Sequence, residues 1–338
     1  MATVGIIGCG AITRKRQAPA CRAHAETTLA GFSDMDISRA QELAAQFGGR
    51  AYASMEEMLA DPSVTAVCVC VPEQAHLDVT VRCLEAGKDV LLEKPMAMNL
   101  AEGEAIMQAW EKSGRKLMIA YSQRFYAEHT LAKRLMQEGE IGRVFSFRTS
   151  LSNPGVEYAV YGADQDFYDR NLNRIGGVMS NVGCHRIDLI RYLFDSEIEE
   201  VFAYTPVLDK RFSNGERINR EDHAMLTLKL RNGISGMMWS SWCNYGAPDQ
   251  GTWIFGDRGV LRTYDGAGVR VYRRNGGVLE HAVHRTQRDI DGWGVVTSFL
   301  DSLARGTEVA TTGRDGLECM RVLDAIERSH AAGGWVRV

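Results

Sequence analysis

The chain has 338 residues, of which 45% are hydrophobic and 24% charged, and its formal net charge is −4. This length predicts two domains, and the composition is that of an ordinary globular protein. The weak negative charge argues against a nucleic-acid-binding protein, and no apolar run reaches the roughly 20 residues of a membrane helix.

The first 122 residues alternate short apolar runs with helical patterns. Strands are predicted at residues 3–8, 29–33, 64–71, 90–92 and 116–121. Helices are predicted at residues 37–47, 74–86 and 99–113, and the capping box at residues 54–57 predicts the start of another. The β-branched run that ends at Pro72 is typical of a strand buried on both faces. This alternation predicts an α/β domain with a doubly wound parallel sheet.

The remainder, residues 123–338, has a different character. A mixed helical region extends to about residue 195, and two helices, at 293–305 and 314–331, are predicted near the end. Between them, strands are predicted at residues 198–207, 223–230, 235–242, 251–255 and 260–264. Asn232-Gly233 and Asn275-Gly276 are strong hairpin turns. We therefore predict two domains, 1–122 and 123–338, the second an α+β domain with a large, mostly antiparallel open sheet.

A glycine-rich loop follows the first predicted strand and precedes a helix. Its sequence includes Gly8, Gly10, Ala11, Ile12 and Thr13. The first glycine permits a tight turn, the second lets the backbone approach a pyrophosphate, and the helix N-terminus attracts the negative charge. The loop therefore indicates a Rossmann dinucleotide site, although such glycines also occur in ordinary turns.

Asp34 ends the second strand, about 20 residues after the loop, where a carboxylate can accept hydrogen bonds from a ribose 2′-hydroxyl. The same carboxylate would repel a 2′-phosphate, so NAD is favoured and NADP is the alternative. The opposing signal is a set of nearby basic residues that could reach a phosphate or form a solvated face: Arg14, Lys15, Arg16 and Arg39.

Two further motifs carry chemistry. Glu93-Lys94-Pro95 directly follows a predicted strand, at the edge where open α/β sheets bind ligands, and a partly desolvated lysine there can exchange protons; a surface lysine in a turn is the alternative. Later, Asn181 and His185 are four residues apart on one helical face, with Asp188 three residues beyond. This pattern suits a proton relay, but also a buried helix with satisfied polar groups.

These motifs, in this order, resemble the glucose–fructose oxidoreductase / inositol dehydrogenase (Gfo/Idh/MocA) family along essentially the whole chain. The resemblance implies hydride transfer between the nicotinamide and a sugar, polyol or inositol hydroxyl. Lys94 would hydrogen-bond the reacting oxygen and His185 would exchange its proton. The positions that fall where the family contacts its cofactor are Gly8, Gly10, Ala11, Ile12, Asp34, Val71, Pro72, His76, Glu93, Lys94, Gln123 and Arg124.

Asn181 departs from the family pattern, because many members have an aspartate beside the catalytic histidine. A carboxylate there would favour the protonated imidazole, whereas an amide can only hydrogen-bond a substrate hydroxyl. We therefore place Asn181 with Lys94 and His185 in the predicted catalytic group. The departure leaves two alternatives open: a redox-assisted glycoside-cleaving or epimerising enzyme, and a non-catalytic NAD sensor.

The remaining expectations concern substrate, partners and location. The predicted substrate-binding residues are Lys94, Tyr161, Asn171, Arg174, Asn181 and His185. The resemblance implies a homodimer or homotetramer formed through the C-terminal sheet. The eight cysteines have no metal-binding spacing, so we expect reduced thiols, no metal site and a cytoplasmic location.

Overall fold

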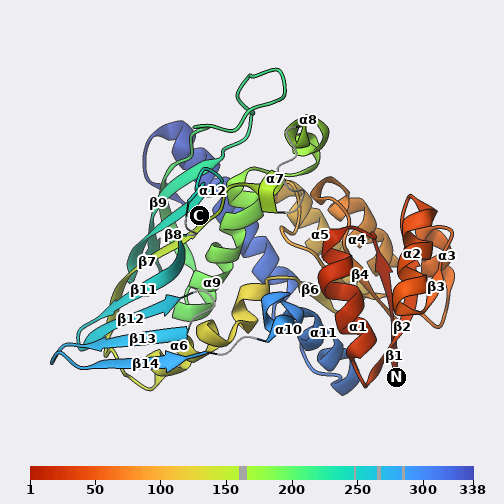
Figure 1. Cartoon of the computed structure of the whole chain (residues 1–338), viewed down its shortest axis with the longest axis horizontal. Coiled ribbons are helices and arrows are strands. Elements are labelled where there is room, and N and C mark those ends of the chain that lie inside the picture. The colour runs from red at the N-terminus through yellow and green to blue at the C-terminus, as the bar shows by residue number, and fades with distance from the viewer. Residues whose placement is uncertain (160–165, 247–248, 265–267, 284–285) are drawn as a thin grey trace. The chain divides into compact units, whose positions relative to one another are not determined.

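The computed structural model describes residues 1–159, 166–246, 249–264, 268–283 and 286–338. It divides into two compact units, and Figure 1 labels most of their helices and strands. The first comprises Met1–Ser122 and Gln287–Met320, and the second comprises Gln123–Thr286 and Arg321–Val338. Residues 287–320, which the sequence analysis assigned to the second domain, thus belong to the first unit.

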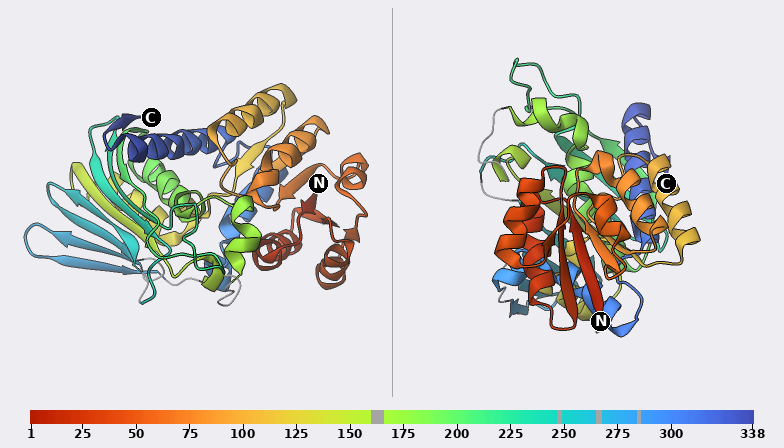
Figure 2. Two further views of the ribbon diagram at one scale, coloured as in Figure 1. Left: turned by 90° about the horizontal axis from the view of Figure 1, so that it is seen from above. Right: turned by 90° about the vertical axis from the view of Figure 1, so that its right-hand side faces the viewer.

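The first unit is built on a six-stranded parallel sheet. Its strands are β1 (Ala2–Ile7), β2 (Thr27–Ser33), β3 (Arg50–Ala51), β4 (Ala66–Val69), β5 (Asp89–Leu92) and β6 (Leu117–Ile119). They lie in the order β3-β2-β1-β4-β5-β6, with helices on both faces (Figure 2, right). All four residues of β4 are buried, as its β-branched run predicted. The predicted doubly wound sheet is confirmed.

The connecting elements of this unit are η1 (Thr13–Gln17), α1 (Ala18–Ala23), α2 (Ile37–Phe47), α3 (Met55–Ala60), η2 (Glu73–Ala75), α4 (His76–Glu85) and α5 (Leu100–Ser113). Three helices of this unit, α2, α3 and α5, begin at a residue whose side chain caps them. At the start of α5, the Asn99 side chain accepts a hydrogen bond from Glu102 N at 3.0 Å. Asp36 does the same for Ser38 N at the start of α2, at 3.1 Å. These bonds pair backbone donors that a helix leaves without internal partners.

The late segment of the first unit contains α10 (Gln287–Ile290), α11 (Trp293–Arg305) and the first part of α12 (Gly313–Ala332). It pairs with the edge strand β6: Ile119 N donates to Thr311 O at 2.9 Å, and Thr312 forms a bridge with Met118. Because this pairing occupies an otherwise open sheet edge, it explains why the segment packs here.

The second unit contains a nine-stranded, mostly antiparallel sheet, as predicted. Its strands are β7 (Val144–Ser152), β8 (Ile198–Tyr204), β9 (His223–Leu230), β10 (Ser235–Ser241), β11 (Gln250–Gly256), β12 (Gly259–Tyr264), β13 (Gly268–Arg273), β14 (Val278–Ala282) and β15 (Val336–Arg337). Their order is β14-β13-β12-β11-β7-β10-β9-β8-β15. The central strand β7 lies parallel to β10, in the region predicted from the sequence as mixed helical, where no strand was expected.

Helices cover one face of this sheet, which we call the inner face. The helical elements are η3 (Ser122–Phe125), α6 (Ala127–Gln137), α7 (Val156–Ala159), α8 (Phe167–Asn171), η4 (Leu172–Arg174), η5 (Met179–Gly183) and α9 (Cys184–Phe194). Phe147 on β7 stacks against Phe194 on α9 with a 4.9 Å centroid separation. The left view of Figure 2 shows α9, in green, beside these strands.

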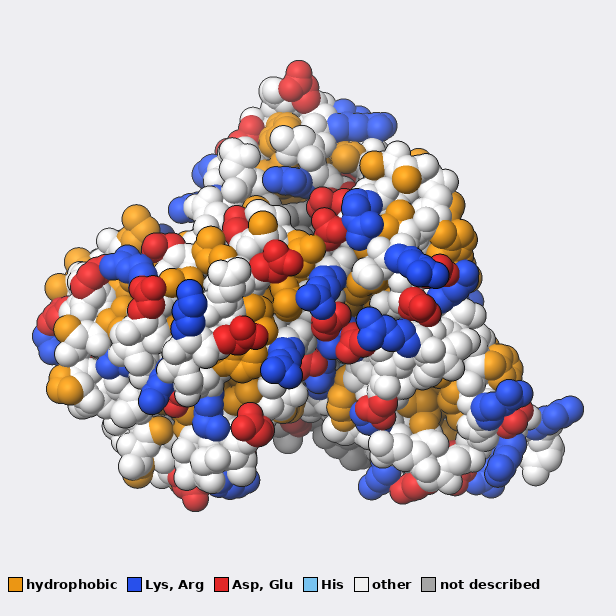
Figure 3. Space-filling view, turned by 180° about the vertical axis from the view of Figure 1, so that it is seen from behind, with side chains coloured by type: hydrophobic (Ala, Val, Ile, Leu, Met, Phe, Trp, Pro, Cys, Tyr) orange, Lys and Arg blue, Asp and Glu red, His pale blue; other side chains and the backbone are white. Residues whose placement is uncertain are grey.

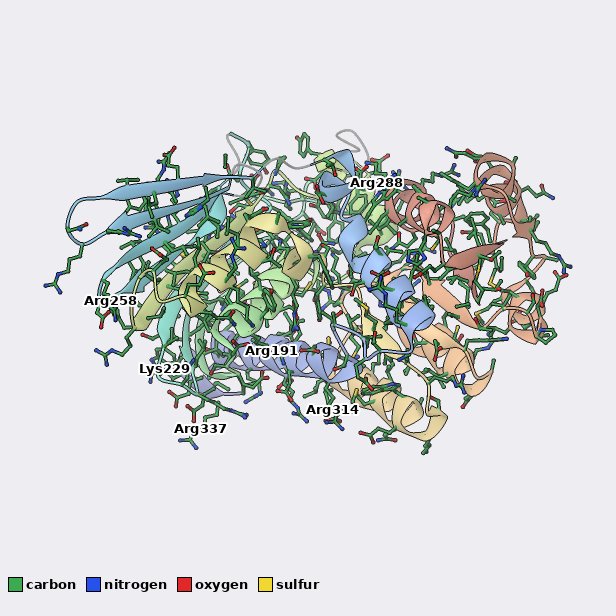
Figure 4. The ribbon with its side chains drawn as sticks, turned by 90° about the horizontal axis from the view of Figure 1, so that it is seen from below. Arg191, Lys229, Arg258, Arg288, Arg314 and Arg337 are labelled. Atoms are coloured by element: carbon green, nitrogen blue, oxygen red, sulfur yellow. The ribbon has the colours of Figure 1, made fainter. Side chains whose placement is uncertain are left out.

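The opposite, outer face exposes several large apolar side chains. Exposed members on β8, β9 and β10 are Phe202, Tyr204, Met225, Met237 and Trp239. Near its β15 edge, the Lys229 ammonium pairs with Glu200 at 2.7 Å, and Arg337 lies 3.9 Å from the same carboxylate (Figure 4). This face therefore has an apolar centre and a charged edge.

On the face drawn in Figure 3, acidic and basic side chains of the described residues intermingle. None of the helices in the described part of the chain is long and apolar enough to cross a membrane.

Candidate active site

The glycine loop sits between β1 and η1 in a conformation that its residues require. Gly8 has a φ of +94°, and a Cβ there would lie 2.4 Å from the Cys70 carbonyl oxygen. Around Gly10, by contrast, a Cβ would meet no described atom within 4 Å. The buried Thr13 hydroxyl donates to Gly8 O at 2.6 Å, so the third fingerprint position holds the turn by a hydrogen bond. The loop thus presents open backbone at Gly10 before a helical N-terminus.

Asp34 lies at the end of β2, beside this loop. Its carboxylate accepts hydrogen bonds from Cys9 N at 2.7 Å and from Asp36 N at 3.0 Å. The side chain is half-buried, so it keeps an accessible edge. The sequence spacing of about 20 residues therefore does bring this carboxylate to the glycine loop, where a ribose diol would lie.

Carboxylates engage three of the four basic residues that could have received a 2′-phosphate. Arg14 forms two hydrogen bonds with Glu42, at 2.6 and 2.8 Å. Arg39 lies 3.5 Å from Asp36. Arg16 donates to Glu93 at 3.3 Å and to the Asp291 carbonyl at 3.1 Å. This pairing reduces the positive charge offered to a phosphate and fits NAD better than NADP.

The Glu93-Lys94-Pro95 motif begins directly after β5. The Glu93 carboxylate is 7% exposed and accepts hydrogen bonds from Gln17 Nε2 at 2.5 Å and Lys94 N at 3.3 Å. It therefore ties the lysine turn to η1, and this link between residues 76 positions apart was not evident from the sequence. Lys94 itself is half-buried.

His76, the first residue of α4, lies at the same carboxyl edge of the sheet. Its ring is 1% exposed, with Nδ1 at 2.8 Å from Pro95 O and Nε2 at 3.1 Å from Val71 O. Burial lowers the pKa of this imidazole, which favours its neutral form. Pro72 follows Val71 and leads into η2. The carboxyl ends of β1, β2, β4 and β5 thus bring together the first-unit positions predicted to bind the cofactor.

In the second unit, Asn181 and His185 lie on η5 and at the start of α9, one helical turn apart, and both side chains are half-buried. Met179–Gly183 is a π-helix, a form often found at functional sites. Asn181 N donates to Gly177 O at 3.0 Å. The predicted helical face carrying both residues is therefore present.

Arg124 and Asp188 form a buried ion pair in the second unit. The guanidinium donates from Nε at 2.8 Å and from Nη2 at 2.6 Å, and the Asp188 side chain is fully buried. From the sequence, Arg124 was predicted to bind the cofactor and Asp188 to share a helical face with His185; in the structure, Arg124 and Asp188 bind each other. Neighbouring Gln123 is 6% exposed, and its Oε1 has no hydrogen-bond partner among the described residues.

Among the predicted substrate-binding residues of the second unit, Asn171 ends α8 and Arg174 ends η4. The Asn171 amide donates to Phe167 O at 2.9 Å, and Arg174 on η4 is exposed. Tyr161 lies outside the described residues.

A polar cluster that the sequence analysis did not single out lies in the same unit. The Lys210 ammonium, 5% exposed, pairs with Glu157, which also accepts a 2.7 Å hydrogen bond from the Tyr168 hydroxyl. Burial and this carboxylate raise the pKa of Tyr168. Only the fold brings these residues together, because Lys210 is 53 positions from Glu157. Within the described part of the chain, no group of three His, Cys, Asp or Glu residues is placed to hold a metal ion.

Comparison with known proteins decides the family. Residues 2–121 match the family model described as "Oxidoreductase family, NAD-binding Rossmann fold", and residues 129–262 match the GFO/IDH/MocA C-terminal domain. The chain belongs to the Gfo/Idh/MocA oxidoreductase family. The resemblance expected from the sequence is thereby confirmed, and the first unit is an NAD-binding Rossmann fold.

Curated Gfo/Idh/MocA relatives include inositol dehydrogenases. Myo-inositol 2-dehydrogenase of Thermotoga maritima is 27% identical over 260 residues, covering 76% of this chain and 74% of the relative. Inositol 2-dehydrogenase of Rhizobium meliloti is 25% identical over 333 residues, covering 97% and 96%. Among solved structures, levoglucosan dehydrogenase in complex with NADH and levoglucosan has a TM-score of 0.88 at 22% identity, covering 100% of this chain and 99% of that one. This last likeness establishes the shared fold.

Proposed function

We propose that this oxidoreductase is an NAD-dependent dehydrogenase that acts on a CH–OH group of an inositol, polyol or sugar. The observation that carries the proposal is the assembly at the edge of the first sheet, where Asp34, Glu93 and the open backbone at Gly10 meet. NADP is the less favoured cofactor, because carboxylates engage most of the nearby arginines. Curated inositol dehydrogenases among the relatives support this substrate class.

The residues present fit NAD. Asp34 would accept hydrogen bonds from the adenosine ribose, and the backbone at Gly10, Ala11 and Ile12 would face the pyrophosphate. Bound NAD supplies a hydride acceptor at C4 of its nicotinamide. His76 and Glu93 would act by holding the turn that carries Lys94, since both are buried within the sheet edge.

Oxidation of an alcohol also releases the hydroxyl proton, and the chain must handle it. In our proposal the Lys94 ammonium donates a hydrogen bond to the reacting oxygen and orients it. The His185 imidazole accepts the proton as the carbonyl forms. Asn181, one turn away, hydrogen-bonds a substrate hydroxyl through its amide and carries no proton.

Further substrate contacts are proposed from the second domain. Asn171 and Arg174 belong to the helical stretch that precedes Gly176, and Tyr161 precedes them in sequence. Polar and aromatic groups of these types suit a polyhydroxylated ring. The proposed division of labour is that domain 1–122 binds NAD and domain 123–338 binds substrate. Location in the cytoplasm stays a prediction.

The outer face of the nine-stranded sheet supports assembly with a second copy of the chain. Tyr204, Met225 and Trp239 are register neighbours on three adjacent strands and are all exposed. Exposed apolar patches of this kind commonly mark interfaces. A two-fold axis through this face would bring the same patch of both copies together, so we propose a homodimer, or a homotetramer that contains this dimer.

The test is absorbance at 340 nm with NAD or NADP and a panel of inositols, sugars and sugar acids. We expect reduction of NAD with one substrate class. Lys94→Ala should lower kcat about 100- to 1000-fold, the usual cost of removing a hydrogen-bond donor to the reacting oxygen, while the Kd for NAD changes less than about threefold. Lys112→Ala, an exposed lysine of the same unit, is the matched control. Full activity of Lys94→Ala refutes the assigned role, and NAD binding without turnover across the panel favours a redox-assisted lyase or a sensor.

A further inference from the structure

One residue, Glu221, hydrogen-bonds the backbone at the start of η5. Glu221 comes two positions before β9. Its carbonyl oxygen accepts a hydrogen bond from Val178 N at 2.8 Å. Its side-chain Oε1 accepts another from Met179 N at 3.1 Å. These are successive N–H groups at a helical N-terminus, where internal partners are lacking. A single residue from another part of the chain therefore satisfies both.

Gly177 makes room for this carboxylate. A Cβ on Gly177 would lie 2.3 Å from Glu221 Oε2 and 2.4 Å from Oε1, closer than non-bonded atoms approach. Gly177 is absent from the glycines with positive φ, so its backbone is one that other residues adopt. The three atoms nearest to such a Cβ all belong to Glu221, so the two residues form one contact.

The fastened segment leads directly to Asn181 and His185. Gly177 O accepts the hydrogen bond from Asn181 N at 3.0 Å. Met179 O accepts the backbone N–H of Cys184, the residue before His185. If Gly177 and Met179 moved, these two hydrogen bonds would therefore move Asn181 and His185, the two predicted active-site residues, with them.

The surroundings of Glu221 favour a buried acceptor over a solvated charge. Burial is the largest influence and raises the pKa of this carboxyl, the bond from Met179 N lowers it, and Glu327 raises it while Arg220 lowers it. A carboxyl group held this way needs its hydrogen-bond geometry more than its charge. Glutamine keeps the same acceptor oxygen, whereas alanine removes it.

We infer that Glu221 is a positioning residue, which acts with Gly177 to set where η5 begins and so where Asn181 and His185 stand. The inference rests on the proposed function, in which those two residues meet the substrate. It predicts that the loss of Glu221 affects turnover far more than cofactor binding.

The experiment compares Glu221→Ala, Glu221→Gln and Gly177→Ala, using NAD and myo-inositol as the probe. Displacements of about 1 Å can cost about 100-fold in rate, so we expect Glu221→Ala and Gly177→Ala each to lower kcat by about 10- to 100-fold. Glu221→Gln should retain more than about half of the wild-type kcat, and the Kd for NAD should change less than about twofold in all three. Glu327→Ala is the matched control, because it removes a nearby exposed charge without a bond to η5.

Two additional measurements keep the outcomes separate. Hydrogen exchange of a peptide covering residues 176–185 should speed up in Glu221→Ala and not in Glu221→Gln, whether or not myo-inositol is turned over. The double variant Gly177→Ala/Glu221→Ala should lose no more than Glu221→Ala alone, because the two changes break one contact. Wild-type-like exchange and kcat in Glu221→Ala, or equal losses with alanine and glutamine, overturn the inference. Full activity of His185→Ala instead overturns the proposed function.

Discussion

Replacing Asp34 with serine tests the basis of cofactor choice. The variant would lack the hydrogen bonds that the ribose donates to the Asp34 carboxylate. Hydrogen bonds to a charged group contribute about 1.5–3 kcal/mol. At about 1.4 kcal/mol per factor of ten, the Kd for NAD should rise about 10- to 100-fold. The variant also removes the repulsion of a 2′-phosphate, so the Kd for NADP should change less, and the preference for NAD should shrink by about tenfold.

The assay is calorimetric titration of wild-type and variant protein with NAD and with NADP. Asp36→Ser is the matched control, since it removes an exposed carboxylate two residues away that caps α2. Because Asp34 also accepts from Cys9 N, thermal unfolding without cofactor will report the separate cost to the loop, about 1 kcal/mol. A change in the Kd for NAD below about threefold, or one equal to that of Asp36→Ser, would refute the assignment of Asp34 to the ribose.

Three further outcomes follow from contacts within the units. Arg124→Ala should lower the free energy of unfolding, measured in urea, by about 3 kcal/mol. This is the low end for a broken buried ion pair, because Arg191 also lies 4.0 Å from Asp188. Arg134→Ala, which removes an exposed arginine, should lower it by less than about 0.5 kcal/mol, and equal effects of the two variants would contradict the importance of the pair. Met237→Glu should weaken self-association at least about 100-fold, because the new charge would be buried in the dimer interface. Val278→Glu, on the edge strand β14, should leave self-association unchanged. Light scattering measures the molar mass, and an unchanged mass of Met237→Glu would place the interface elsewhere. Burial lowers the pKa of His76 in the folded protein below its usual 6.5, so the unfolded chain binds the proton more readily. The free energy of unfolding of the wild type should therefore exceed that of His76→Asn by less as the pH falls below about 6.5. A difference that does not change with pH would contradict this.

Local patterns were sufficient for most of the first unit. The β-branched run before Pro72 predicted the fully buried β4, and Asn99 with Glu102 predicted the start of α5. These features depend on residues close together in sequence, so periodicity and capping chemistry could reveal them. The glycine loop and Asp34 were also predictable, because a fixed spacing joins them.

Features that depend on distant partners could not be predicted in this way. Strand β7 alternates apolar or β-branched residues, from Phe145 to Leu151, with polar ones, a period-2 pattern that indicates a half-buried strand; its central place in the sheet follows only from its pairing with β10 and β11. Residues 64 positions apart form the Arg124–Asp188 pair. The motif residues were visible, but whether each touches a ligand or another motif residue is decided by the fold.

The late segment has a consequence for how the protein is made. Strand β6 ends at Ile119, yet the residues that cover its outer edge, Thr311 and Thr312, are synthesised almost 200 positions later. During translation, domains generally fold as they emerge from the ribosome, N-terminal first. Here the nascent Rossmann sheet has an unprotected edge until most of the second unit has already emerged. Chains released early by truncation or stalling will therefore expose the edge of β6, and the NAD-binding unit can be completed only near the end of synthesis.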